Sequence, residues 1–164
     1  ALHQRLFILR RLRESLPQKK LLIVAEAIFN SKIRYDLPLF AHCRLSDQEA
    51  VNGQMASLQK LQNDMMRTVL GVTRSDHVSR QTLLERTGLT SVNHMAVSSV
   101  LMETFKILHY DTIPDLKTTL TATDTSDYSL RSQHKNNLQS VPVRKNRNKG
   151  FLQSSVFTWN SLVA

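Results

Sequence analysis

The sequence predicts an all-α or mostly α fold, a helical bundle of about five to six helices with an irregular basic C-terminal segment. Two observations support this prediction. The 164 residues include only four glycines and four prolines, fewer than a turn-rich β sandwich needs. Apolar residues also recur at helical spacing in several separate segments, which is the main sequence signal of amphipathic helices. The hydrophobic share of 41% is ordinary for a globular chain.

The first forty residues are expected to form two helices. Three leucines share one face of the first helix, over residues 1–15: Leu2, Leu6 and Leu9. Pro17 ends this helix, because proline disfavours helical geometry in the residue before it, and proline suits the first turn of the next helix. Residues 21–35 are apolar most of the way round, which is typical of the buried centre of a bundle. Pro38 is expected to end or kink this second helix.

The clearest helical pattern covers residues 46–70. Ser46-Asp47-Gln48-Glu49 is a capping box, in which the serine and glutamate side chains satisfy backbone amides at the start of a helix. Gly71 supplies the C-terminal stop. Apolar residues at helical spacing mark the inner face: Val51, Met55, Leu58, Leu61, Met65 and Val69. The opposite face carries polar and charged side chains: Lys60, Asn63 and Arg67.

The remaining helices are shorter or less regular. They are expected at residues 79–87 before Gly88, 91–110 after the cap Ser91, 115–120 after Pro114, and 151–162. The inner stripe of the second of these is expected to be Val97, Leu101, Phe105 and Leu108. The predicted organisation is a helical bundle over residues 1–120, a polar and basic linker or loop over 121–150, and a C-terminal helical segment over 151–164 that packs back on the bundle.

The net charge of +9 is concentrated at the two ends of the chain. Residues 1–20 carry six basic groups and one acid, a balance of +5, and residues 131–164 carry six basic groups and no acid. Residues 21–130 carry ten basic groups and twelve acids, a balance of −2. Two cationic ends around a nearly neutral body indicate a polyanionic partner. The alternatives are that the basic ends only solvate the chain, or meet an acidic protein or a membrane surface.

Two segments in register resemble a known family. The first is the run Leu58-Gln59-Lys60-Leu61-Gln62-Asn63, closed by three further positions: Arg67, Gly71 and Arg74. The second, far downstream, is Phe151…Ser155…Trp159-Asn160-Ser161-Leu162. Together they are similar to the region that follows the catalytic palm in reverse transcriptases of non-LTR (LINE-type) retrotransposons. The run Arg10-Arg11-Leu12-Arg13 and the segment 21–35 resemble the basic helix and the apolar helix of that region, whereas Val163 replaces the usual proline.

The resemblance implies the thumb and post-thumb part of such an enzyme, with residues 1–120 as a thumb-like bundle. A thumb holds the template–primer duplex behind the active site, so the implied partners are RNA or an RNA–DNA hybrid and, secondly, the palm domain of the parent polymerase. A chain that begins at Ala1 is expected to be cut from something longer. Basic residues are the candidate phosphate contacts: Arg144, Lys145, Arg147 and Lys149 near the C-terminus, Arg10, Arg11 and Arg13 in the first helix, and Lys60, Arg67 and Arg74 around the clearest helix. For Lys60 and Arg67 the alternative is an ordinary solvated helix face.

No catalytic residue, cofactor site or metal site is predicted. Reverse transcription requires two metal ions held by clustered aspartates, and the sequence contains no adjacent pair of aspartates. We therefore expect a fragment without enzymatic activity of its own, lacking the palm. His42-Cys43 is the only neighbouring His/Cys pair, and a zinc site would need two more ligands at suitable spacing.

Three other hypotheses stay open. The chain could be a helical protein-interaction module, or a retroelement remnant that docks on a partner such as the missing palm, and an exposed apolar patch would mark it. Residues 1–16 could form an arginine-rich membrane or targeting helix, although Glu14 argues against this. Trp159 could stack on an unpaired base, but core packing is the more ordinary role of a large aromatic side chain.

One cysteine and no apolar run of membrane-spanning length favour an intracellular protein, nuclear or cytoplasmic, with no membrane contact.

Overall fold

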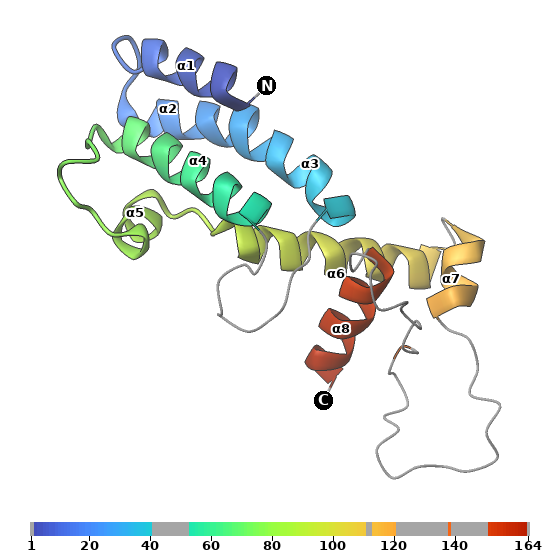
Figure 1. Ribbon diagram of the computed structural model, residues 1–164. Helices are drawn as coiled ribbons and strands as arrows, with labels where there is room; N and C mark the ends of the chain where they lie inside the picture. Colours follow the sequence, from blue (N-terminus) through green and yellow to red (C-terminus); the bar gives the residue numbers. More distant parts are fainter. Residues whose placement is uncertain (1, 41–52, 111–112, 121–137, 139–150, 164) are drawn as a thin grey trace, which may run out of the picture. The chain divides into compact units, whose positions relative to one another are not determined.

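A computed structural model describes residues 2–40, 53–110, 113–120, 138 and 151–163 (Figure 1). Over these ranges the chain is helical and contains no β strand, which confirms the predicted all-α fold class. The predicted capping box at 46–49, the basic cluster at 144–149 and nearly all of the predicted linker lie outside the described residues. The predicted division of the chain at residues 120 and 150 therefore stays a prediction.

The described part of the chain contains nine helical elements. They are α1 (Leu2–Leu12), α2 (Gln18–Ala25), the π-helical turn η1 (Glu26–Asn30), α3 (Ser31–Phe40), α4 (Gly53–Leu70), α5 (Arg80–Thr87), α6 (Val92–Tyr110), α7 (Pro114–Leu120) and α8 (Phe151–Val163). They belong to two units, which are described separately below. The N-terminal unit comprises Ala1–Asp36 and Glu49–Met95, and the C-terminal unit comprises Leu37–Gln48 and Ala96–Ala164.

In the N-terminal unit, α1, α2 and α4 pack against one another, and α5 packs on α4 (Figure 1). Leu6 and Leu9 of α1 are buried, as the leucine spacing predicted. Pro17 stands immediately before α2 in an extended conformation, so it separates the first two helices as expected. The core of this unit is aliphatic and thioether-rich, and its fully buried side chains include Leu9, Leu21, Phe29, Met65, Met66 and Leu83.

Helices α2 and α3 continue into one another through η1. The Ser31 amide donates to the carbonyl of Glu26, the spacing of a π turn, and the side chain of Arg5 donates to the carbonyl of Ile28. The buried side chains form one stripe, namely Leu21, Ala25, Phe29 and Ile33. Ile23 and Tyr35 are 68% and 78% exposed, so the prediction of a helix buried on all sides is wrong. Pro38 lies inside α3 and does not end it.

Helix α4 buries a wider surface than its apolar spacing predicted. Met55, Met65 and Val69 are buried as expected, whereas Leu58 and Leu61 are only half-buried. Gln62 and Met66 are completely buried instead. The reason is that α4 contacts α1 and α2 as well as α5, so it is covered on more than one side. A single apolar stripe cannot predict a helix enclosed in this way.

Three amide side chains of α4 form a hydrogen-bonded group, the amide cluster, made of Gln59, Gln62 and Asn63. Gln62 donates to the carbonyl of Thr90 at 2.8 Å and accepts from Gln59 Nε2 at 2.8 Å. Gln59 also donates to Asn63 at 2.9 Å and accepts from the amide of Val92 at 2.9 Å. The cluster therefore joins α4 to the start of α6. Asn63 was predicted to face outward, but its carbonyl belongs to this internal network.

The predicted stop of α5 at Gly88 and the predicted cap of α6 at Ser91 are confirmed, and α5 also has an N-cap at Ser79 that was not predicted. Ser79 accepts from the amide of Thr82 at 3.2 Å, and Gly88 adopts a left-handed conformation with φ of 68°. Ser91 likewise accepts from the amide of His94 at 3.3 Å. The predicted inner stripe of α6 is wrong, because the buried positions are Val92, Met95, Ala96, Val100, Thr104 and Ile107. The helix is apolar over much of its circumference, so spacing alone does not select a face, and Phe105 is 42% exposed.

In the C-terminal unit, α6, α7 and α8 contribute to one apolar cluster around Ile107, Leu120, Leu138 and Val156. Trp159 packs against this cluster, which supports core packing over base stacking for this residue. The side chain of Asn160 accepts from the Leu138 amide at 2.8 Å and donates to the Leu138 carbonyl at 2.9 Å. One asparagine thus satisfies both backbone groups of a buried leucine. Residues from both segments that carry the family resemblance, 58–63 and 151–162, therefore make internal hydrogen bonds.

Candidate nucleic-acid interface

An open depression of about 320 Å³ lies on the N-terminal unit between the end of α1 and the second half of α4. Its lining is strongly basic and comes from two distant segments of the chain: Arg10, Arg13, Asp64, Arg67, Thr68, Val72, Thr73 and Arg74. We call this the arginine depression. Four of the ten predicted phosphate contacts line it, and its four arginines against one aspartate give a net formal charge of +3.

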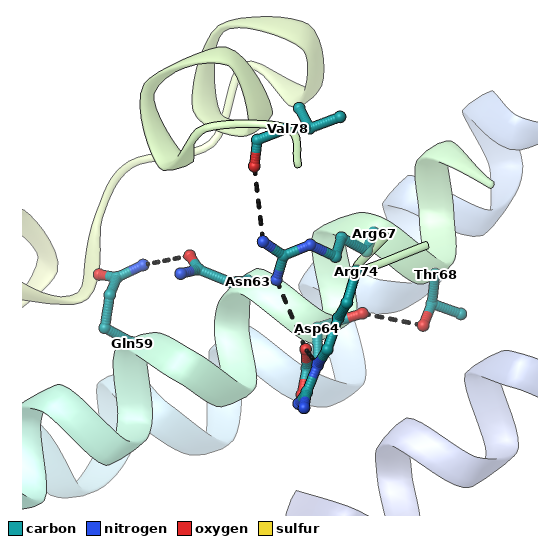
Figure 2. Close-up of polar contacts among 7 residues, drawn as sticks. All are labelled: Gln59, Asn63, Asp64, Arg67, Thr68, Arg74 and Val78. Atoms are coloured by element: carbon teal, nitrogen blue, oxygen red, sulfur yellow. Dashed lines mark hydrogen bonds and ion pairs between the residues drawn. The ribbon is translucent and has the colours of Figure 1, made fainter. Parts of the chain in front are cut away.

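Asp64 holds two of the arginines together (Figure 2). Arg74 donates two hydrogen bonds to the Asp64 carboxylate, from Nε at 3.1 Å and from Nη2 at 2.5 Å. Nη1 of Arg67 lies 3.5 Å from the same carboxylate. The Asp64 side chain is 14% exposed while that of Arg74 is 77% exposed. A largely buried carboxylate therefore holds the end of a solvent-exposed arginine. The hydrogen bond and the charge of Asp64 raise the pKa of Arg74, so the pair favours the charged form that an arginine already has.

Arg67 is the most enclosed cation of the depression. Its side chain is 21% exposed, and its two polar contacts are long, 3.5 Å to Asp64 and 3.5 Å to the Val78 carbonyl (Figure 2). Its Nε is buried and has no hydrogen-bond partner among the described residues. A guanidinium has five N–H donors, so an enclosed one with two marginal contacts leaves hydrogen-bonding capacity unused. Such a group favours the arrival of an oxygen-rich anion.

The turn after α4 is built so that Arg13 and Arg74 approach the depression. Gly71 has a φ of 74°, and the Val72 amide donates to the Arg67 carbonyl at 3.1 Å, which together close a Schellman-type helix end. The guanidinium of Arg13 lies over Gly71, where a Cβ atom would meet its Nη2 at 2.8 Å. The absence of a side chain at this position therefore leaves room for the cation. Gly71 was predicted only as a helix stop.

Residues 73–77 form a compact turn organised by Asp76. Its carboxylate accepts from the Thr73 amide at 2.6 Å and from the Thr73 hydroxyl at 2.9 Å. These hydrogen bonds, the backbone one first, lower the pKa of Asp76 below its ordinary value of 3.8. His77 follows with a φ of 47°, and its amide donates to the Arg74 carbonyl at 3.3 Å. The turn thereby fixes the backbone from which Arg74 extends.

The other predicted contacts are placed elsewhere. Arg11 lies over the ring of Phe7, 4.7 Å from its centroid, and does not line the depression. Lys60 is exposed on α4 and does not line it either. The cluster of Arg144, Lys145, Arg147 and Lys149 falls outside the described residues. Four of the ten candidate residues therefore lie together at the depression, and for the other six a role in binding stays a prediction.

Asp64 is the charged residue of the depression that reasoning from the sequence did not identify. A signal was present, since Asp64 and Arg67 are three positions apart on a helix and such pairs face the same side. The contact with Arg74 carried no such signal, because it depends on the reversal of the chain at Gly71. The approach of α1 to this turn likewise follows only from tertiary packing.

No family model, curated protein or solved structure matches this chain. Within the described ranges, no three His, Cys, Asp or Glu side chains are grouped so that they could hold a metal ion. None of the described helices combines the length and the apolar character needed to cross a membrane. Assignment of a function to the arginine depression therefore depends on its own chemistry.

Proposed function

We propose that this chain is a non-catalytic nucleic-acid-binding fragment of a retrotransposon reverse transcriptase, which grips template RNA or an RNA–DNA hybrid through phosphate contacts. The observation that supports binding is the convergence of four arginines, from two distant segments, on one depression. Arginine contacts to phosphate supply affinity and position without reading the base sequence. The link to a retrotransposon enzyme is supported by the resemblance of residues 58–74 and 151–162 alone.

The exposed arginines are the proposed contacts to the nucleic-acid backbone. Arg10, Arg13 and Arg74 are exposed at the depression. Their forked guanidinium groups can meet phosphate oxygens with two parallel hydrogen bonds. Arg74 is paired with Asp64, but its side chain is 77% exposed, so a phosphate can reach its guanidinium from solvent. The C-terminal basic cluster at 144–149 would extend the same electrostatic surface along a strand.

Salt-dependent binding tests this proposal. A labelled RNA–DNA hybrid and an RNA hairpin are titrated with the full chain at about 50 and 200 mM salt and followed by fluorescence anisotropy. We expect micromolar or tighter binding at the lower salt. The three phosphate contacts of Arg10, Arg13 and Arg74 should by themselves weaken binding roughly fortyfold over this range, because each contact contributes about 0.9 to the salt exponent, and contacts from the C-terminal basic cluster would add to this dependence. Absence of binding at the lower salt would refute the proposal.

A protein-interaction module is the second candidate. The N-terminal unit exposes several large apolar side chains that could dock on a partner such as a polymerase palm: Phe7, Ile8, Ile23 and Tyr35. Two of these are partly covered by cations, since Arg11 lies over Phe7 and Lys32 lies 5.2 Å from the Tyr35 ring centroid. Docking through apolar surface would persist at high salt, whereas phosphate binding would not, so the same titration separates the two candidates.

A further inference from the structure

Arg67 differs from the other arginines of the depression in how deeply it lies. Its side chain is 21% exposed, compared with 77% for Arg74, while Arg10 and Arg13 are exposed. Arg67 is held from both sides at 3.5 Å, by the Asp64 carboxylate and the Val78 carbonyl. The depression therefore has a recessed cation surrounded by exposed ones. The exposed arginines can contact a ligand at the rim of the depression, whereas Arg67 can contact only a group that enters it.

A phosphate inside a strand and a phosphate at its end fit such a site differently. An internal phosphodiester carries one negative charge and two free oxygens, and the chain continues on both sides of it. The exposed arginines can meet it, but the strand must stay at the rim. A terminal phosphate monoester carries three free oxygens and about −1.5 to −2 charges near neutral pH. Its chain leaves on one side only, so the group can enter a depression with its oxygens foremost.

The charge of the depression favours the terminal group. Four arginines against Asp64 leave +3, more than a single phosphodiester neutralises. The guanidinium of Arg67 is loosely held, because its Nη1 and Nη2 contacts are both 3.5 Å long, so it gains most from an added acceptor. We infer that the arginine depression binds the terminal phosphate monoester of a nucleic-acid strand, with Arg67 as the recessed contact. This inference rests on the proposed function, since it concerns the same site.

The test compares RNA strands that differ only at an end. Three labelled RNAs of one sequence carry a 5′-phosphate, a 3′-phosphate or hydroxyls at both ends, and each is titrated with the full chain at about 100 mM salt. One of the two phosphorylated RNAs should bind about tenfold tighter than the hydroxyl RNA, as a charge-assisted hydrogen-bond pair would give. Which end is preferred identifies the source of the monoester.

Two matched substitutions assign the preference to Arg67. Arg67→Lys keeps the charge but removes the forked donors, so the preference for the phosphorylated RNA should fall to within about twofold. Thermal unfolding of Arg67→Lys, compared with the parent chain, reports whether the variant is folded. Arg34→Lys is the control, because Arg34 pairs with Glu26 in the same unit and lies outside the depression. It should keep the full preference.

The outcomes separate this inference from the proposed function. Equal affinity for all three RNAs, with binding that still falls with salt, would overturn end recognition and leave backbone binding intact. A preference that survives Arg67→Lys unchanged would overturn the assigned contact. No binding of any RNA at low salt would overturn the proposed function and the inference together.

Discussion

Two neighbouring groups of polar side chains on α4 behave in opposite ways. The amide cluster is internal, and its hydrogen bonds measure 2.8–2.9 Å. Asp64 and Arg67 instead face an open depression, and both contacts of Arg67 are 3.5 Å long. Figure 2 shows Gln59 and Asn63 paired with each other while Arg67 reaches towards two separate acceptors. The same helix therefore carries one polar group with short hydrogen bonds, the amide cluster, and one with long contacts, the Arg67 guanidinium.

This difference distinguishes a structural role from a binding role. A buried polar group with good partners stabilises one arrangement of the chain, and removal of any member leaves the others unpaired. A cation with poor partners adds little stability, but it can accept a ligand without first breaking strong bonds. We therefore expect substitutions in the amide cluster to change the free energy of unfolding, and substitutions around the depression to change affinity.

The largest effect is expected at the centre of the amide cluster. Gln62→Ala should lower the free energy of unfolding by about 2–4 kcal/mol, because it leaves a cavity and strips the Thr90 carbonyl of its donor. Lys60→Ala, on the same helix but exposed, is the control and should cost under about 0.5 kcal/mol. Urea denaturation measures both. A loss as small as that of the control would mean that the cluster does not hold α4 to the start of α6.

Two glycines with left-handed backbones provide a matched pair. Gly71→Ala and Gly88→Ala should each cost about 1–2 kcal/mol, because φ is 74° and 68° at these positions. Only Gly71→Ala also displaces a cation, since its Cβ would meet Arg13 Nη2, whereas nothing lies within 4 Å of a Cβ at Gly88. Thermal unfolding and anisotropy on the same samples compare the two variants. Equal RNA affinity would show that the position of Arg13 does not matter for binding.

Neutralising the C-terminal basic cluster measures its share of binding. Changing Arg144, Lys145, Arg147 and Lys149 together to alanine should reduce the salt exponent of binding by about 3–4 and leave the unfolding midpoint nearly unchanged. The effect on stability should be small because the cluster is polar throughout and carries no apolar side chain. An unchanged exponent would assign the binding to the depression alone.

The smallest effect concerns the turn that carries Arg74. The folded pKa of Asp76 is lowered by its hydrogen bonds with Thr73, so the contribution of this carboxylate is present above its unfolded pKa of about 3.8 and is lost as the pH falls through the lower folded value. An NMR titration of the Asp76 carboxyl should give a midpoint below 3.8. In Thr73→Ala, which removes the hydroxyl donor, the midpoint should move back towards the ordinary value. A midpoint at or above 3.8 in the parent chain would contradict the turn geometry.

The helices could be predicted from residues close together in the sequence. The predictions failed where a feature depends on how distant segments pack. The caps and stops at Pro17, Gly71, Gly88 and Ser91 depend on backbone chemistry within a few residues, so they could be predicted from the sequence. The buried face of α6 was missed because an apolar circumference does not select a side. The burial of Gln62 was missed because its partner, the Thr90 carbonyl, is distant in sequence and carries no side-chain signal.

The candidate site was predictable in its composition but not in its assembly. Basic side chains are conspicuous in the sequence, so Arg10, Arg13, Arg67 and Arg74 were all named as candidates. Nothing local indicated that these four meet and that Arg11 does not, because this depends on how α1 lies against α4. Asp64 was not among the candidates, because only basic residues were considered as phosphate contacts, yet it is the group that pairs with both Arg67 and Arg74.

The central claim is that the position of the arginines, and not the overall charge, determines binding. The most direct test compares Arg10→Ala/Arg13→Ala with Lys19→Ala/Lys20→Ala, two variants that lose the same charge from the same unit, while only the first pair lines the depression. Affinity for the RNA–DNA hybrid is measured by anisotropy from about 50 to 200 mM salt. We predict that the arginine variant loses about 2 from the salt exponent and at least tenfold in affinity, with a much smaller change for the lysine variant. Equal losses in the two variants would contradict the account.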